Sequence, residues 1–347
     1  MADCHQILLA RSRILLFFGL FFGFVLPLSA QHSASPIGYV TIGSSARVGP
    51  PAVLASGCFV GDGKQFVTVL GFGIGPETRD LAIHGFDGPE LPASFLAQDP
   101  QTGLVLLEVP SKEAAGLTLG ESKGLGIGTP LRIGGSAVRR TMLGEPRNVP
   151  AMNVGGPQMR NARLVGYEIS HRGRAFPLRH LLVAQPDART ATMPGTPVLS
   201  EKGTLVGLVH GMTNQPPGTC FVLPSEAIAK VRSCYARDGM VSPAWVGLVV
   251  DTGRNTPVVL ELRADSPAAL CGILPGDVIC AVADRSVRSV SDLVDACYYL
   301  NPDTPVDLAL IRGTEPMAVS LTPGRMPTLK TKAKPSLYPV STGGEEQ

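Results

Sequence analysis

The residue types best suited to chemistry lie in a turn-rich segment, Ala191–Leu199, and shortly after it. The segment carries the hydroxyls of Thr192 and Thr196, and His210 follows the next strand-like run. A hydroxyl beside an imidazole base is the pair that acyl transfer uses, provided that an oxyanion hole accompanies it. No serine or cysteine occurs between His171 and Leu199, so the usual nucleophiles are missing there. We therefore interpret His210 first as a hydrogen-bonded structural residue.

The same segment resembles the nucleophile loop Gly-Asn-Ser-Gly-Gly-Pro-Leu of the trypsin-like HtrA/Deg serine proteases. In that register the nucleophilic serine corresponds to Pro194, which has neither a hydroxyl nor a backbone N–H. The oxyanion hole of this class uses the N–H of the nucleophile itself. The resemblance therefore implies that this loop has lost both its nucleophile and one oxyanion donor.

Two further stretches resemble the same family in the same chain order. Residues 56–71 are similar to the stretch that runs from Ser-Gly into Val-Thr-x-x-His, and the general base corresponds to Gly71. Residues 99–109 are similar to Asp-Pro-x-Thr-Asp-Leu-Ala-Leu-Leu, and the orienting aspartate corresponds to Gly103. Because all three positions are replaced, we predict that the chain is not an enzyme but a catalytically inactive, HtrA-like pseudoprotease.

Two other hypotheses stay open. The first is an endopeptidase with a rewired active site, in which Thr192 or Thr196 would pair with His210. The second is a scaffold of the cell envelope, in which the barrels serve only as a spacer and no peptide is bound.

The fold class that we expect is mainly β. From about Pro36 to Leu223, short apolar runs are broken by glycine, proline and aspartate, a pattern typical of an all-β barrel or sandwich. The resemblance implies a trypsin-like double β-barrel, which we place at residues 36–239. Its last element would be a helix that Ser225 caps and Gly239 ends.

A second domain, a small α+β PDZ domain, is predicted at residues 244–324. Residues 264–279 resemble the PDZ signature Ser-Pro-Ala-x-x-Ala-Gly-Leu-x-x-Gly-Asp-x-Ile. Ser266 and Pro267 would begin a short helix, and Gly272 would end it. Ser289 and Asp292 form a capping-box-like start for a second helix.

The PDZ resemblance implies a site for peptides or protein C-termini. Such domains add a peptide as an extra strand, and backbone N–H groups hold its carboxylate. The loop Trp245–Leu248 is similar to the family's Gly-Leu-Gly-Phe, and Trp245 could either block the groove or contact the first domain. The predicted binding residues are Val246, Gly247, Leu248, Val250, Leu293 and Cys297. The alternative is that these residues only pack the core of the small domain.

The two ends of the chain are predicted to lie outside the folded domains. Arg11 and Arg13 precede an apolar run, residues 14–28, and small residues follow it, so residues 1–30 are predicted to be a cleaved signal peptide. The run is shorter than the roughly 20 residues of a spanning helix. We therefore expect export to the periplasm or cell exterior without a stable membrane span. Residues 325–347 are predicted to be a disordered tail.

Composition limits the remaining partners. The net charge is only +2 and charged residues make up 17%, so no field of one sign favours nucleic acid. Six cysteines remain after residue 30, mostly in apolar contexts, and we interpret them as free buried thiols. No spacing indicates a metal site, and no cofactor is expected. The resemblance implies a possible homo-trimer, or a hetero-oligomer with an active homologue.

Overall fold

The computed structural model describes residues 35–42, 52–70, 74–85, 90–110, 115–135, 158–168, 178–187, 192–214, 217–251 and 254–326. The predicted signal peptide and Gly71 lie outside these residues. So does the predicted tail beyond Met326. None of the helices in the described ranges combines the length and the apolar character needed to cross a membrane.

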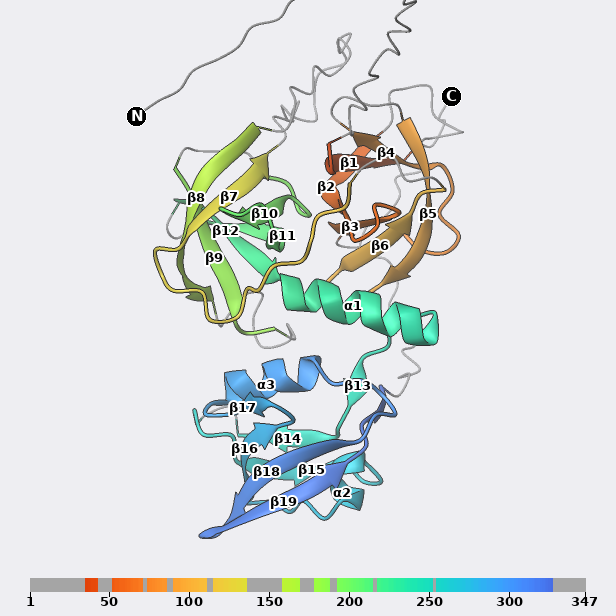
Figure 1. Ribbon diagram of the computed structural model, residues 1–347. Helices are drawn as coiled ribbons and strands as arrows, with labels where there is room; N and C mark the ends of the chain where they lie inside the picture. Colours follow the sequence, from red (N-terminus) through yellow and green to blue (C-terminus); the bar gives the residue numbers. More distant parts are fainter. Residues whose placement is uncertain are drawn as a thin grey trace, which may run out of the picture. The chain divides into compact units, whose positions relative to one another are not determined.

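The first six strands close into a barrel in the order β1-β2-β3-β6-β5-β4 (Figure 1). All six pair antiparallel with their neighbours, which suits consecutive runs that are joined by short turns. Their bounds are β1 Ile37–Ile42, β2 Ala52–Val60, β3 Gln65–Val69, β4 Leu81–Gly85, β5 Glu90–Gln98 and β6 Leu104–Glu108.

The next six strands close a second antiparallel barrel in the order β10-β11-β12-β9-β8-β7. Their bounds are β7 Pro130–Gly135, β8 Gln158–Glu168, β9 Leu181–Pro186, β10 Pro197–Ser200, β11 Leu205–Asn214 and β12 Pro217–Pro224. Helix α1, Ser225–Asp238, follows and packs against strands of both barrels (Figure 1).

Helix α1 ends where the sequence predicts, but it begins differently. Gly239 adopts a left-handed conformation with φ of 67°, and its N–H donates to the carbonyl of Tyr235. Ser225 does not cap the helix, because it is the first helical residue and the cap position is Pro224. The Ser225 hydroxyl instead donates to the carbonyl oxygen of Gly120 at 2.6 Å. This bond ties the start of the helix to the connection between β6 and β7.

The C-terminal domain combines short strands with two helices (Figure 1). Its main sheet has the order β17-β16-β18-β19, and β14 pairs with β15 and β13 with β20. The two helices begin at the predicted serine caps, because Ser266 accepts from Ala269 N and Ser289 from Asp292 N. The bounds are β13 Ala244–Trp245, β14 Leu248–Val250, β15 Val259–Leu262, α2 Pro267–Leu270, β16 Val278–Val282, β17 Arg285–Ser286, α3 Val290–Tyr298, β18 Val306–Arg312, β19 Glu315–Leu321 and β20 Gly324–Arg325.

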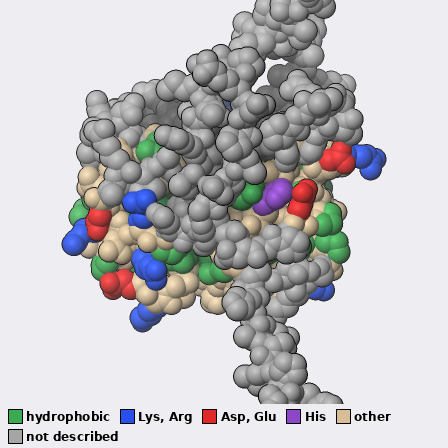
Figure 2. All heavy atoms as spheres, turned by 90° about the horizontal axis from the view of Figure 1, so that it is seen from above, with side chains coloured by type: hydrophobic (Ala, Val, Ile, Leu, Met, Phe, Trp, Pro, Cys, Tyr) green, Lys and Arg blue, Asp and Glu red, His purple; other side chains and the backbone are tan. Residues whose placement is uncertain are grey.

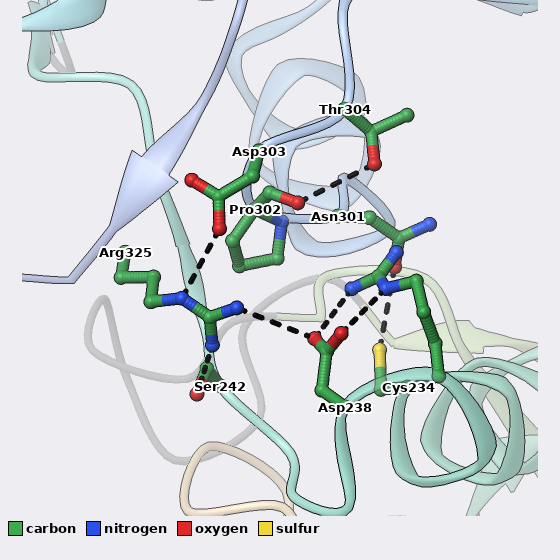
Figure 3. Close-up of polar contacts among 9 residues, drawn as sticks. Cys234, Asp238, Ser242, Asn301, Pro302, Asp303, Thr304 and Arg325 are labelled. Atoms are coloured by element: carbon green, nitrogen blue, oxygen red, sulfur yellow. Dashed lines mark hydrogen bonds and ion pairs between the residues drawn. The ribbon is translucent and has the colours of Figure 1, made fainter.

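A polar cluster joins the end of α1 to the end of the C-terminal domain (Figure 3). Arg325 places its guanidinium 3.1 Å from the Asp303 carboxylate and 3.6 Å from that of Asp238. It also donates to the hydroxyl of Ser242, at 3.3 Å, in the connection between α1 and β13. The start of the predicted tail is thus held in place at Arg325.

Buried side chains form a separate core in each barrel and in the C-terminal domain, and a further cluster extends from α1 between the two barrels. The sequence has nearly equal numbers of basic and acidic residues, 30 and 28. In the coloured part of the face in Figure 2, acidic and basic side chains are interspersed, and no large area carries one sign.

Candidate functional site

The turn that carries Pro194 is held tightly against the first barrel. The N–H of Ser56 donates to the Pro194 carbonyl at 3.0 Å, and the N–H of Gly195 donates to the carbonyl of Val209 at 2.7 Å. Gly195 has a φ of 81°, and a Cβ there would lie only 2.0 Å from the Ser56 carbonyl oxygen. Pro194 itself supplies no donor or nucleophile, so the backbone of this turn is used for structure.

Gly103 lies beside the strand end that leads to position 71. The N–H of Leu70 donates to the Gly103 carbonyl at 2.9 Å, and Gly103 has a φ of 75°. A Cβ at Gly103 would lie 2.7 Å from the Leu70 carbonyl oxygen. The backbone here therefore favours glycine over the aspartate that the resemblance would place at this position. Leu70 is the last described residue before position 71, and Gly71 itself lies outside the described residues.

Hydroxyl groups do remain next to the Pro194 turn. Thr196 is 1% exposed, and its hydroxyl accepts from the N–H of Met193 at 3.2 Å. Its carbonyl accepts from Val209 N at 2.8 Å, which places it beside the strand residue that precedes His210. His210 is 5% exposed and has an interaction partner. Thr192 donates to Sδ of Met212 at 3.0 Å.

A second site is an apolar groove between β14 and α3, with a volume of about 400 Å³. Its lining residues are Gln101, Ala244, Trp245, Val246, Gly247, Leu248, Val249, Val250, Arg263, Leu293, Val294, Cys297, Tyr298 and Met326. All six residues that the sequence predicted for peptide binding are among them. Several also pack the core of the domain, so the two readings of these residues are compatible. Burial raises the pKa of the Cys297 thiol to about 12, which keeps it neutral.

The backbone along this groove has unused hydrogen-bonding groups. In the described part of the chain, no hydrogen bond is donated by the N–H of Val246 or Gly247. The N–H of Arg263 donates to the Gly247 carbonyl at 2.9 Å, next to the pair Leu248↔Leu262. Leu248 therefore belongs to a non-hydrogen-bonded pair, and its own N–H points to the free edge of β14. The strand edge can accept an added strand.

Gly247 is the residue that lets the loop turn at this edge. Its φ is 83°, and a Cβ there would lie 2.2 Å from Cβ of Ser266, so no other residue fits without movement. Trp245 is half-buried, lines the groove and pairs with Gly324 in the strand ladder. It forms part of the wall and leaves the groove open.

Eight lining residues were not among the six predicted for peptide binding: Gln101, Ala244, Trp245, Val249, Arg263, Val294, Tyr298 and Met326. Tyr298 lies in the predicted helix, but it directly follows Cys297 and so falls off the face that the 3.6-residue repeat selected. Met326 lies just beyond the predicted domain. Gln101 belongs to the loop that ends at Gly103 in the first barrel. Nothing in the sequence indicates that this loop would reach the groove.

Helix α3 is tied to that same loop by a buried carboxylate. The Tyr298 hydroxyl donates to Oδ2 of Asp99 at 2.8 Å, and the Thr102 hydroxyl donates to the same oxygen at 2.6 Å. Lys230 of α1 donates to the Tyr298 carbonyl, and its ammonium lies 3.7 Å from the centre of the Tyr298 ring. Burial raises the pKa of Tyr298 and lowers that of Lys230. One wall of the groove is therefore anchored to the first barrel and to α1.

A second anchor joins α3 to the second barrel. The Asp295 carboxylate accepts from the backbone N–H groups of Arg179 and His180, and from Nδ1 of the His180 ring. Asp292 lies 3.7 Å from the other ring nitrogen. The hydrogen bond to Asp295 raises the pKa of His180 above its ordinary value, so the charged ring is favoured between two carboxylates.

Comparison with known proteins agrees with this architecture. A family model described as "PDZ domain" matches residues 245–322. The chain is 25% identical over 259 residues to a "Probable periplasmic serine endoprotease DegP-like" of Halomonas elongata, covering 70% of this chain and 50% of that protein. It is 24% identical over 269 residues to the protein of the same description from Pseudomonas putida, covering 72% and 52%. The chain thus spans about half the length of these relatives.

Solved structures show the same fold. The chain resembles "HtrA-type protease AlgW with decapeptide" with a TM-score of 0.60 and 17% identity, covering 86% of this chain and 97% of that one. It resembles the serine endoprotease from Yersinia pestis with a TM-score of 0.56 and 19% identity, covering 86% and 96%. The predicted fold class is confirmed: the chain has the HtrA-type, trypsin-like double barrel followed by a PDZ domain.

The prediction that the chain is not an enzyme is wrong as it was stated. The relatives that it matches are named serine endoproteases, and the described residues do not show that the site is inactive. Replacement of three positions does not establish inactivity, because hydroxyls of Thr192 and Thr196 and the ring of His210 remain near the Pro194 turn. The names of these relatives likewise do not support the prediction of a pseudoprotease.

Proposed function

We propose that this HtrA-type protein binds peptides or protein C-termini in the groove between β14 and α3 of its PDZ domain. The observation that carries the proposal is the strand edge at Val246, Gly247 and Leu248, beside an apolar groove. Within the described residues the N–H groups of Val246 and Gly247 donate no hydrogen bond, and the register of β14 turns that of Leu248 to the free edge. An incoming carboxylate would accept from these donors, and its last side chain would enter the space beside Leu293 and Cys297. A peptide held in this way gains backbone hydrogen bonds and apolar burial together.

The match to a PDZ model supports the proposal, as does the likeness to an HtrA-type protease whose structure is described with a decapeptide. The periplasmic description of the relatives supports export of this chain, in agreement with the basic and apolar start of the sequence. We keep the domain bounds 36–239 and 244–324 as proposals. A trimer, or a hetero-oligomer with an active homologue, is proposed on the family resemblance alone.

A binding measurement on the full mature chain tests the groove. The probe is a panel of fluorescein-labelled decapeptides with free carboxylates and apolar last residues, read by fluorescence anisotropy. Val294 is half-buried and lines the groove, so V294W should fill part of it and weaken binding at least about tenfold, equivalent to about 1.4 kcal/mol. Leu270 is 79% exposed and outside the groove, so L270W is the matched control and should bind normally. Equal binding by V294W and wild type would contradict the proposed site.

A second candidate function is endopeptidase activity by a rewired site. The specific observation in its favour is that the curated relatives are named serine endoproteases. Because Pro194 and Gly103 lack the groups of a serine triad, the nucleophile and base would have to come from neighbouring residues. Thr196 and His210 are the candidates, since the Thr196 carbonyl is bonded to the residue before His210.

This candidate predicts steady hydrolysis of unfolded casein by the purified chain. The rate should fall by at least about a hundredfold in T196V and in H210Q, the scale expected when a nucleophile or general base is removed. T204V is the control, because Thr204 lies in the turn after β10 and its hydroxyl hydrogen-bonds to that of Ser200, away from Thr196 and His210 in the sequence. Absence of hydrolysis, or hydrolysis that T196V and H210Q leave unchanged, would reject the rewired site.

A further inference from the structure

We propose that a cavity where α1, the second barrel and the C-terminal domain meet is a binding site for a small organic carboxylate. The cavity has an inner part of about 250 Å³ and an outer part of about 320 Å³. The two parts are continuous through four lining residues that they share: Lys123, His180, Arg285 and Asp295. None of the described residues that line either part also lines the peptide groove. The site is therefore independent of the proposed peptide binding.

Arg285 is held at this cavity without a carboxylate partner. It is half-buried at the start of β17, and its guanidinium carbon lies 3.8 Å from the centre of the Tyr299 ring. Arg237, Arg312 and Arg325 each have a carboxylate within 3.1 Å. In the part of the chain that the structure describes, the Arg285 side chain has no hydrogen bond and no ion pair. Because stacking on a ring uses none of its N–H groups, they remain available to an acceptor.

Two further donors at the cavity lack an acceptor. Tyr299 lines the inner part, and burial raises the pKa of its hydroxyl, which therefore stays protonated. Lys123 is exposed, lies in the connection between β6 and β7, and lines both parts. Within the described ranges, neither the Tyr299 hydroxyl nor the Lys123 ammonium forms a hydrogen bond. Buried polar groups normally have a partner, and a bound acceptor would supply one for this hydroxyl.

The carboxylates of the inner part already have donors of their own. Glu226 accepts from the N–H groups of Ser122 and Lys123, at 3.1 and 3.0 Å, and from the Ser122 hydroxyl. Asp295 accepts from two backbone N–H groups of the second barrel and from the His180 ring. The open groups of the inner part are therefore donors, and two of them are cations. This arrangement favours an anionic acceptor.

The rest of the inner wall limits what can carry that anionic group. Leu178 and Leu182 are each 2% exposed, and Pro224 is buried beside them on the wall. They offer an apolar surface to an aromatic ring or a short aliphatic chain. A second negative charge on the ligand would be repelled by Glu226 and Asp295. The ligand that we infer is therefore a monocarboxylate with an apolar body.

Two other carboxylates, those of Asp284 and Asp292, line only the outer part. The Asp292 carboxylate accepts from the N–H of Arg288 at 2.9 Å, whereas Asp284 is exposed. Their charge disfavours an anion in the outer part. We therefore expect the carboxylate of the ligand in the inner part, between Arg285 and Lys123.

The test is a titration of para-fluorobenzoate into the full chain, followed by fluorine NMR. The matched neutral probe is para-fluorobenzamide, which keeps the ring and lacks the charge. The acid should bind at least about tenfold more tightly than the amide, because hydrogen bonds between charged groups are the stronger ones. Benzoate should displace the probe, and acetate, which lacks the apolar body, should displace it far less effectively.

Five variants locate the site. R285Q and K123Q should each weaken binding of the acid about tenfold and leave that of the amide unchanged. Because Lys123 is exposed, K123Q tests the site without disturbing the packing. Y299F deletes one hydroxyl and should weaken the acid about threefold. R288Q is the matched control, since Arg288 is exposed and lines neither part. V294W, which fills the peptide groove, should also bind like wild type.

Three results would overturn the inference. Failure of the acid to bind, or equal binding of the acid and the amide, would mean that these donors do not form a carboxylate site. Loss of binding in V294W, with R285Q and K123Q unchanged, would place the acid in the peptide groove. Displacement by acetate as effective as displacement by benzoate would show that the apolar wall does not take part. None of these results depends on whether peptides bind.

Discussion

We expect the substitution D99A to lower the free energy of unfolding by about 3 kcal/mol or more, because it removes a buried carboxylate that three donors share. Asp99 is 1% exposed and accepts from Gln101 N, from the Thr102 hydroxyl and from the Tyr298 hydroxyl. Its loss leaves those donors without their acceptor, and orphaned buried donors cost about 1–3 kcal/mol each. It also removes a negative charge that favours the protonated form of buried Lys230.

Urea unfolding followed by far-ultraviolet circular dichroism measures this effect. Y298F is the graded comparison, because it deletes a single hydroxyl and should cost about half as much. D284A is the surface control, since Asp284 is exposed, and it should change stability by less than about 0.5 kcal/mol. If D99A were as stable as D284A, the buried link between α3 and the first barrel would not exist as described.

The second large effect is expected at the turn that carries Pro194. G195A should destabilise the chain by about 3 kcal/mol or more, for two separate reasons. A left-handed conformation costs a residue with a Cβ about 1–2 kcal/mol. The added methyl group would also lie 2.0 Å from the Ser56 carbonyl and 2.6 Å from the Thr68 hydroxyl, both of which are held by hydrogen bonds.

Gly203 provides a closely matched control at the other end of β10. Its φ is 80°, nearly that of Gly195, but nothing lies within 4 Å of a Cβ built there. G203A should therefore show the conformational cost alone, about 1 kcal/mol. Equal thermal stability of the two variants would mean that the Pro194 turn is not packed against the first barrel.

The sequence allowed most of the fold to be predicted because its signals are local. Alternating short apolar runs predicted the barrels, and serine caps at Ser266 and Ser289 marked where two helices begin. The groove residues were predictable because the loop Trp245–Leu248 and the helix face of Leu293 and Cys297 each have their own pattern. The resemblance then placed the loop and the helix on opposite walls of one site.

What could not be predicted depends on contacts between distant parts of the chain. The bond from Tyr298 to Asp99 joins residues that are 199 positions apart, and neither residue has a local pattern that indicates a partner. Gln101 reaches the groove for the same reason. The prediction about enzymatic activity failed for another reason: three replaced positions do not describe the neighbouring hydroxyls of Thr192 and Thr196 or the ring of His210.

The most direct test of peptide binding at the β14 edge is hydrogen–deuterium exchange of the full chain with and without a free-acid decapeptide that binds it. We expect the amides of Val246, Gly247 and Leu248 to become protected when the peptide is added, because they donate to its carboxylate. We also expect slower exchange along β14 as the peptide joins that strand edge. Saturating peptide that leaves these amides unchanged, while protecting amides elsewhere in the chain, would contradict binding at this edge.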